Sequence, residues 1–341
     1  MKTIVLDEPY SFTFTQTEPP GEPGPGEALL RVLRVGICGT DLHAYQGNQP
    51  FFSYPRILGH ELAVEILALG ESDGGHGLAV GDLCAVEPYL NCGTCVACRR
   101  GNTNCCERLL TLGVHTDGGM REYVILPVNK LHKANDVLPE QLALVEMLCI
   151  GAHAARRGGI EAGEPALVVG AGPIGLGTMQ YARALGANVI AMDINPRRLA
   201  FCQDNLGVTM TVDAREDPVA QLRAHLGGEL PRLVFDATGN AKSMMAAFDY
   251  VAHSGRIVFV GLVKGDICFS DPYLHSHELT LLATRNATGD DFRWVIDTLA
   301  SGQVSVRGWD THHATPESMI EQYPSWILPE TGVIKAMVSF A

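Results

Sequence analysis

Apolar and polar positions alternate in short runs through the first 150 residues. The runs include ALLRVLRVGIC, HELAVEILALG, DLCAVEP and REYVILPV, and Gly- and Pro-rich segments separate several of them. Alternation with a period of two is typical of strands that bury one face. The pattern therefore predicts a β-rich, barrel-like domain over residues 1–150.

From about residue 160 the pattern changes to apolar runs separated by amphipathic segments. The runs are PALVVGAG, NVIAMD, TMTVDA, RLVFDATG and RIVFVGL, and the segments between them include PIGLGTMQYARALGA, which has helical spacing. This alternation predicts a parallel, doubly wound α/β sheet over residues 151–287. A helix, DDFRWVIDTLASG, and a last strand, GVIKAMVSFA, follow, and we expect residues 288–341 to return to the β-rich domain.

The composition narrows the class of protein. The chain has 341 residues, of which 46% are hydrophobic and 18% charged, and its net charge is −13. No Lys/Arg-rich run supplies the basic surface that nucleic-acid binding needs. The N-terminal MKTIVLDEPYSF is not a secretory signal, and no apolar stretch approaches the ~18 residues of a membrane helix. We expect a cytoplasmic protein with neither a nucleic-acid partner nor a membrane partner.

Half of the ten cysteines lie in one segment, NCGTCVACRRGNTNCC, at residues 91–106. Cys92, Cys95, Cys98 and Cys106 have the spacing of a closed, four-thiolate Zn²⁺ site, and Cys105 stands outside the pattern. An iron–sulfur cluster is the alternative, but the local fourth cysteine favours zinc. A closed site has no open coordination position, so this zinc is expected to order the lobe and not to catalyse.

The segment VVGAGPIGLG follows a predicted strand and opens a predicted helix. Its glycines Gly170, Gly172 and Gly175 have the spacing of a dinucleotide-binding turn. Asp193 ends the next strand, where a carboxylate binds the adenosine ribose and repels a 2′-phosphate, so we expect NAD and not NADP. The alternative for Asp193 is a helix cap. The remaining predicted cofactor contacts are Pro173, Ile174, Arg198, Ala237, Thr238 and Leu262.

Three further segments carry candidate chemistry: VGICGTDLHAYQG, ILGHELAVE and ALVEMLCIGAHA. With the cysteine lobe and GAGPIG, in this order, they make the chain resemble the zinc-dependent medium-chain alcohol dehydrogenases along its whole length. The resemblance implies a GroES-like catalytic domain and a Rossmann coenzyme domain. In having a glutamate at position 146, the chain resembles the sorbitol, threonine and sugar-acid branch of this family. Its segments LGVHTDGGMREYV and TRNATGDDF resemble the corresponding segments of L-galactonate and L-idonate 5-dehydrogenases.

The resemblance also implies roles for individual residues. Cys38 and His60 would bind a catalytic zinc, while Glu61 and Glu146 would either ligate it or hold its bound water. Thr40 and His43 would carry the alcohol proton to solvent.

Arg285 resembles an arginine that pairs with the active-site glutamate, and it could also bind a substrate hydroxyl or carboxylate. Structural alternatives remain open: Cys38 as a core residue, His60 as a satisfied strand histidine and His43 as a surface residue. Glu61, next to His60 on a predicted strand, would normally face the other way. His115, His312 and His313 have no assigned role.

These observations favour an NAD- and zinc-dependent enzyme that oxidises a secondary alcohol of a polyol or sugar acid to a ketone. A threonine-type amino-alcohol dehydrogenase is the second enzyme hypothesis. A zinc-stabilised, NAD-binding regulator without activity is the non-enzyme hypothesis. Relatives form dimers or tetramers, so the resemblance implies a homodimer or homotetramer.

Overall fold

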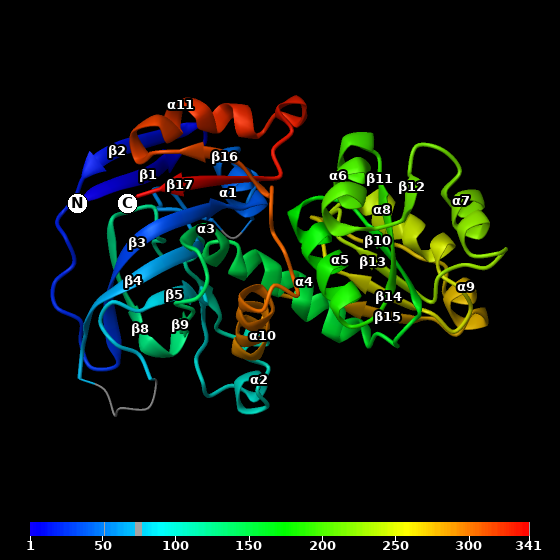
Figure 1. Ribbon diagram of the computed structural model, residues 1–341, viewed down its shortest axis with the longest axis horizontal. Coiled ribbons are helices and arrows are strands. Elements are labelled where there is room, and N and C mark those ends of the chain that lie inside the picture. Colours follow the sequence, from blue (N-terminus) through cyan, green and yellow to red (C-terminus); the bar gives the residue numbers. More distant parts are fainter. Residues whose placement is uncertain (51, 72–76, 341) are drawn as a thin grey trace. The chain divides into compact units, whose positions relative to one another are not determined.

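The computed structural model describes residues 1–50, 52–71 and 77–340 (Figure 1). The chain forms two compact units. Unit 1 comprises Met1–Glu146, Thr288–Gly302 and Val306–Ala341, and unit 2 comprises Met147–Ala287 and Gln303–Ser305. In the described part of the chain, no helix is both long and apolar enough to span a membrane.

A seven-stranded sheet organises unit 1, as the alternating pattern predicts. Its order is β16-β17-β3-β4-β5-β9, and β8 also pairs with β3. These strands are β3 (Glu27–Ile37), β4 (Glu61–Leu69), β5 (Leu83–Val86), β8 (Tyr123–Pro127), β9 (Leu131–Lys133), β16 (Asp310–Ala314) and β17 (Lys335–Ser339). The long strand β3 buries alternate residues up to Val32, and the register with β4 shifts between Val32 and Arg34. Beyond this irregularity, consecutive residues at the end of β3 are buried. The chain therefore runs into the interior just before Cys38.

The strand predicted at the C-terminal end is β17, and it pairs antiparallel with β3 and parallel with β16. This pairing joins the end of the chain to the main sheet of unit 1. The sequence pattern predicts no element between Gly308 and Gly332. That stretch contains β16, η4 (Pro329–Thr331) and the helix α11 (Pro316–Trp326), whose buried face includes Met319, Tyr323 and Trp326.

Shorter elements complete unit 1. The strands β1 (Lys2–Glu8) and β2 (Ser11–Gln16) form one two-stranded sheet, and β6 (Tyr89–Leu90) and β7 (Leu110–Thr111) form another. The helices are α1 (Gly39–Tyr45), α2 (Val96–Arg99), η1 (Thr103–Cys105), η2 (Val128–Lys130), α3 (Pro139–Leu142) and α10 (Gly289–Ala300). The last of these is the helix that the sequence predicts after residue 288. Helix α4 (Val145–Gly158) begins in unit 1 and continues in unit 2.

Unit 2 contains the predicted doubly wound parallel sheet. Its order is β12-β11-β10-β13-β14-β15, and every neighbouring pair is parallel. The strands are β10 (Pro165–Val169), β11 (Asn188–Asp193), β12 (Met210–Asp213), β13 (Leu233–Asp236), β14 (Arg256–Phe259) and β15 (Thr280–Ala283). The helices are α5 (Pro173–Ala184), α6 (Pro196–Leu206), α7 (Pro218–His225), α8 (Ala241–Ala246), η3 (Ala247–Tyr250) and α9 (Asp271–Ser276). The strand order reverses between β10 and β13, and ligands of such sheets bind at the carboxyl ends of the strands at this point.

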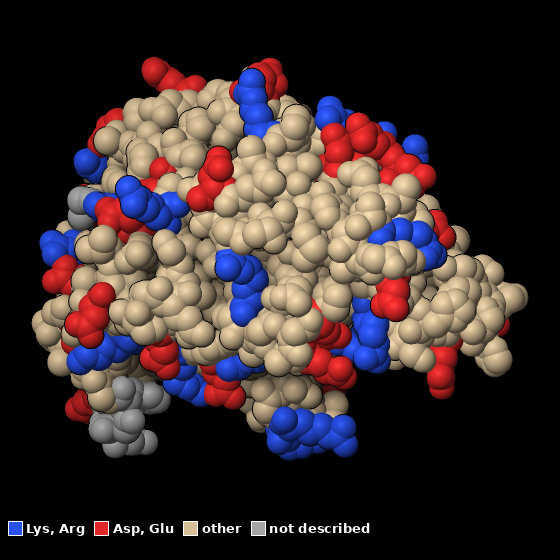
Figure 2. All heavy atoms as spheres, turned by 45° about the vertical axis from the view of Figure 1, so that its right-hand side comes forward, with Lys and Arg blue, Asp and Glu red and all other residues tan. Residues whose placement is uncertain are grey.

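Acidic and basic side chains are interspersed over the face shown in Figure 2. Among the described residues on that face, no continuous basic stripe runs across the surface. The charged side chains of this face thus carry both signs, in a chain whose net charge is −13.

Candidate functional site

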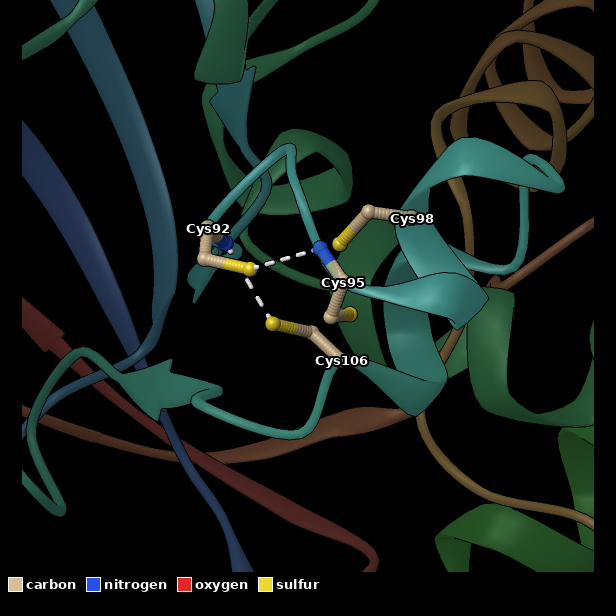
Figure 3. A group of neighbouring side chains, drawn as sticks. All are labelled: Cys92, Cys95, Cys98 and Cys106. Atoms are coloured by element: carbon tan, nitrogen blue, oxygen red, sulfur yellow. Dashed lines mark hydrogen bonds between the residues drawn. The ribbon is translucent and has the colours of Figure 1, made fainter.

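The four predicted lobe cysteines converge in unit 1. The Sγ atoms of Cys92, Cys95, Cys98 and Cys106 all lie within 4.8 Å of one another (Figure 3). The backbone N–H of Cys95 donates to Cys92 Sγ at 3.4 Å, and the N–H of Cys92 donates to Cys106 Sγ at 3.3 Å. Such donors stabilise thiolates, and hydrogen bonds from Thr94 lower the pKa of Cys92 to about 5. Four converging sulfurs fit a closed zinc site, and the exposed Cys105 is not among them.

A buried polar network joins the lobe to the sheet of unit 1. Asn91 Nδ2 donates to Cys98 Sγ at 3.7 Å, and Asn91 Oδ1 accepts from Lys130 Nζ at 2.7 Å. Lys130 Nζ also donates to Glu87 Oε1 at 2.5 Å, and His132 Nε2 lies 3.2 Å from Glu87 Oε2. Glu87 and Lys130 are both buried, so this network fixes the base of the lobe.

A second group of ligand atoms lies at the ends of β3 and β4. Atoms of Cys38, His60 and Glu61 lie within 4.8 Å of one another. Cys38 precedes α1, His60 immediately precedes β4 and Glu61 is the first residue of β4. Because His60 lies outside the strand, the alternation that would send Glu61 to the opposite face does not apply to this pair.

Glu61 is held in place by a buried lysine that the sequence analysis missed. Lys335 Nζ, on β17, lies 2.6 Å from both carboxylate oxygens and donates to the Ile37 carbonyl at 3.0 Å. Glu61 is 0% exposed and Lys335 is 2% exposed. A Cβ on Gly36 would lie 2.3 Å from Glu61 Oε2, so glycine leaves the space that this carboxylate occupies. The sequence feature that indicates such a buried lysine is its position inside the apolar run VIKAMV.

His60 faces a second buried carboxylate. Its Nδ1 lies 3.6 Å from Asp41 Oδ1, and Asp41 Oδ2 accepts from the Cys38 N–H at 2.9 Å. Burial lowers the pKa of His60, but the nearby charges of Asp41 and Cys38 outweigh burial and leave it well above the ordinary value. A carboxylate behind one imidazole nitrogen is the usual way in which a metal-ligating histidine is oriented.

Glu146 lies nearby at the start of α4. It is buried, and its Oε1 accepts a hydrogen bond from the hydroxyl of Tyr89, a residue that sequence reasoning missed. The pKa of Glu146 is raised to about 7, because the effect of burial outweighs the charge of His60 and the Tyr89 hydrogen bond, which both act to lower it. Glu146 does not join the group of three ligand atoms found among the described residues.

The other predicted residues of unit 1 lie around this site or away from it. Thr40 is half-buried and His43 is exposed, and both belong to α1. His115 Nδ1 accepts the Thr111 N–H at 3.0 Å, which indicates a structural role in its turn. His312 is half-buried and His313 is exposed, and neither belongs to a metal-ligand group among the described residues.

The predicted nucleotide turn lies between β10 and α5. Gly170 has φ +94°, which favours glycine, and a Cβ on Gly175 would lie 1.7 Å from the Gly170 carbonyl oxygen. Gly172 is the N-cap of α5, and Pro173 and Ile174 begin that helix. Free N–H groups at such a helix start bind phosphate. The local geometry therefore fits a pyrophosphate.

Asp193 has a defined role in shaping this turn. Its Oδ2 accepts the Ala171 N–H and its Oδ1 accepts the Asn195 N–H, both at 2.7 Å. The cap of α6 is Asn195, whose side chain accepts the Arg197 N–H, so the helix-cap alternative for Asp193 is wrong. Each Asp193 oxygen keeps a further lone pair with which it can accept a ribose hydroxyl.

The other predicted cofactor residues follow strands of the same sheet. Ala237 and Thr238 follow β13, Leu262 follows β14 and is 76% exposed, and Arg198 lies on α6. A Cβ on Gly172 would lie 3.7 Å from Arg198 Nη1, so this guanidinium lies beside the glycine turn. Arg285 is exposed and follows β15 in unit 2.

Comparison with known proteins gives matches over both units. Residues 24–136 match the model of the alcohol dehydrogenase GroES-like domain, and residues 173–301 match that of the zinc-binding dehydrogenase. L-galactonate-5-dehydrogenase from Escherichia coli K12 is 43% identical over 340 residues, which cover 100% of this chain and 99% of that protein. The 2-dehydro-3-deoxy-L-galactonate 5-dehydrogenase of Pseudoalteromonas atlantica is 33% identical over 287 residues, covering 84% and 83% of the two chains.

A solved structure gives the corresponding comparison of folds. The alcohol dehydrogenase rspB from Escherichia coli CFT073, complexed with the cofactor NADH, superposes with a TM-score of 0.92. It is 29% identical in sequence, and the match covers 100% of this chain and 99% of that one.

Proposed function

Because the chain belongs to the zinc-dependent medium-chain alcohol dehydrogenase family, we propose that it oxidises a secondary alcohol of a sugar acid or polyol to a ketone, with NAD as the hydride acceptor. The family gives unit 1 a GroES-like fold and unit 2 a Rossmann fold, as the resemblance implied. Relatives named for L-galactonate and its 2-dehydro-3-deoxy derivative support a sugar acid as substrate. A simple alcohol fits less well, because the buried carboxyl group of Glu146 offers a polyhydroxylated molecule a further polar partner.

The convergence of Cys38, His60 and Glu61 is the observation that carries the proposal. One thiolate, one imidazole and one carboxylate are a donor set that suits Zn²⁺ and leaves a position open for substrate. When bound, zinc supplies Lewis acidity that favours loss of the alcohol proton near neutral pH. Asp41 orients His60, and Lys335 fixes the position of the Glu61 carboxylate.

The remaining side chains have proton and substrate roles in this proposal. Glu146, with Tyr89 behind it, accepts a hydrogen bond from a substrate hydroxyl next to the reacting one and does not ligate the metal directly. The Thr40 hydroxyl takes up the alcohol proton, and His43, which is exposed, passes it to solvent. Arg285 binds a substrate carboxylate or hydroxyl through paired N–H donors.

NAD is favoured over NADP by the carboxylate at the end of β11. A 2′-phosphate about 4 Å from Asp193 would cost on the order of 4 kcal/mol per charge pair at an effective dielectric constant near 20. Arg198, beside Gly172, offers partial compensation for such a phosphate. NADH should therefore bind more tightly than NADPH, and Asp193→Asn should reduce the difference.

The edge of the parallel sheet supports self-association. Strand β15, with the sequence TLLA, has no proline or charge to block pairing, whereas the other edge, β12, carries the Asp213–Arg215 ion pair. Unprotected apolar edges recruit another strand. We propose a homodimer formed through β15, with a homotetramer as the alternative. Light scattering after gel filtration should give twice or four times the chain mass, and Leu281→Lys should lower it to the mass of one chain.

Substrate profiling after a zinc count tests the proposed function. We expect two zinc ions per chain and NADH formation with aldonic acids of galactonate and idonate configuration, at a rate well above that with L-threonine. Cys38→Ser should keep one zinc and lose activity. A higher rate with L-threonine would favour amino-alcohol oxidation. One zinc in the wild type, with no substrate-dependent NADH, would favour a regulator.

A further inference from the structure

Seven buried side-chain polar atoms of unit 1 make no hydrogen bond among the described residues, and three of them belong to α1 or to residues near it. These three are Asp41 Oδ1, His60 Nδ1 and the hydroxyl oxygen of Tyr323. The first two lie 3.6 Å apart, slightly beyond hydrogen-bond distance. Unpaired buried polar atoms are costly and rare, so three in one region point to a hydrogen-bond arrangement that the three residues share.

Aromatic packing fixes the position of Tyr323. It lies on α11, is 0% exposed and contacts three rings. The ring centroids lie 4.9 Å from Phe12, 5.0 Å from Tyr45 and 5.4 Å from Trp326. Packing on this scale holds the ring, so the direction of its hydroxyl is set by the fold.

This packing brings Tyr323 to the face of α1 that carries Asp41. Asp41 and Tyr45 are one turn apart on α1 and so lie on the same face of that helix, and Tyr323 packs against Tyr45. Burial raises the pKa of Tyr323 well above the ordinary value, and the negative charges of Asp41 and Cys38 raise it further. The phenol therefore stays protonated and is a donor close to a carboxylate that has a free oxygen.

We infer that Tyr323 is a positioning residue of the zinc site, whose hydroxyl donates to Asp41 Oδ1 while the same carboxylate accepts the Nδ1–H of His60. The arrangement leaves the other ring nitrogen of His60 to the metal and prevents Asp41 from turning away. Tyr323 belongs to the stretch in which the sequence offered no motif. The inference rests on the proposed metal site at Cys38, His60 and Glu61.

A purely structural role for Tyr323 is the competing explanation, and Tyr45 provides a matched control. Both tyrosines are buried in the same aromatic cluster, and Phe at either position keeps the ring and removes one oxygen. Loss of packing would affect both variants alike. Loss of the contact with Asp41 would affect only Tyr323→Phe.

The test follows zinc transfer from the purified full-length protein to a chromophoric chelator. Cys38→Ser identifies the phase that belongs to the proposed catalytic site, because this variant should keep only the four-thiolate zinc. Tyr323→Phe should weaken zinc retention in that phase about 3- to 10-fold, as expected for one lost hydrogen bond, and leave the four-thiolate phase unchanged. Tyr45→Phe should behave like the wild type in both phases.

Asp41→Asn completes the experiment. It should weaken zinc retention by about 10- to 100-fold, and adding Tyr323→Phe to it should have little further effect. Ultraviolet resonance Raman spectra of the wild type and Asp41→Asn give a second measurement that needs no Tyr323 variant. The difference spectrum should show one phenol whose carboxylate acceptor has been replaced by a weaker amide acceptor.

Three results would overturn the inference: wild-type zinc retention in Tyr323→Phe, an equal loss in Tyr45→Phe, or a Raman spectrum that Asp41→Asn leaves unchanged. A wild-type protein that holds only the four-thiolate zinc would refute the proposed metal site as well.

Discussion

Replacement of Lys335 by Met removes the cation that both oxygens of Glu61 contact at 2.6 Å. Breaking a buried ion pair by removing one partner costs about 3–5 kcal/mol, because the remaining charge is left uncompensated. Glu61 has 0% exposure and cannot be rehydrated without movement of β3 or β4. We therefore expect the zinc-free Lys335→Met variant to lose about 3–5 kcal/mol of unfolding free energy in unit 1.

Zinc should reduce that loss. A divalent cation bound beside Glu61 compensates the carboxylate in place of the lysine, so the zinc-loaded variant should be destabilised less than the zinc-free one. Comparing the zinc-free and zinc-loaded variant separates the free energy of the ion pair from that of packing the lysine methylene groups, because zinc replaces only the charge.

Tryptophan fluorescence during urea unfolding is a suitable assay. The three tryptophans of the chain, Trp294, Trp309 and Trp326, all lie in unit 1, so the signal follows that unit. Lys133→Met is the matched control, since Lys133 pairs with Asp82 at 2.8 Å but its side chain is 44% exposed. Loss of this lysine should cost about 1 kcal/mol, because its side chain is solvated and the buried Asp82 still accepts hydrogen bonds from Asn135 and from the Ala79 N–H. Equal effects of the two variants, or no effect of zinc on the Lys335→Met loss, would refute the reasoning.

Three other predictions concern the cofactor turn, the substrate and the polar network. Gly175→Ala should destabilise unit 2 and abolish NADH binding, because its Cβ would lie 1.7 Å from the Gly170 carbonyl oxygen. Gly172→Ala should weaken NADH binding without destabilising the unit, because its Cβ would meet only Arg198 Nη1, at 3.7 Å. Calorimetry and NADH titration check both variants, and a stable Gly175→Ala variant would contradict this prediction. Arg285→Leu should reduce kcat/KM about 10- to 150-fold on a sugar acid, the loss expected for a charge-assisted hydrogen bond, and much less on a simple secondary alcohol; equal losses would exclude substrate binding by Arg285. Burial alone would raise the pKa of Glu87, but hydrogen bonds and charge from His132 and Lys130 lower it below the ordinary 4.5. The ionised Glu87 carboxylate therefore stabilises the folded state above pH 4.5, and this stabilisation is lost as the pH falls further. Glu87→Gln should therefore be less stable than the wild type at neutral pH, and thermal melts should show the gap narrowing below pH 4.5; a gap independent of pH would contradict the sign.

The parts of the fold that depend on local pattern were predictable. Strands β10 to β14 and the turn at Gly170 follow from apolar runs and glycine spacing, which act over a few residues. Helix α11 was missed because Pro324 interrupts its pattern and its apolar face is short. The spacing of the four lobe cysteines likewise gave a site whose members lie within sixteen residues of each other.

The groups that support the second site could not be found in this way. Lys335 and Glu61 are 274 residues apart in sequence, and only the pairing of β17 with β3 and of β3 with β4 brings them together. Tyr89 and Tyr323 are indistinguishable in sequence from ordinary core aromatics. The orientation of Glu61 depended on where β4 begins, and a shift of one residue at a strand end changes the face on which a side chain lies.

A zinc count by mass spectrometry of the native chain and of two single variants tests the central claim most directly. Cys38→Ser removes a ligand of the three-residue site, and Cys98→Ser removes one of the four lobe thiolates. The account predicts two zinc ions in the wild type and one in each variant, with NADH formation lost in Cys38→Ser. A wild-type chain with one zinc, or a Cys38→Ser chain that retains two, would contradict it.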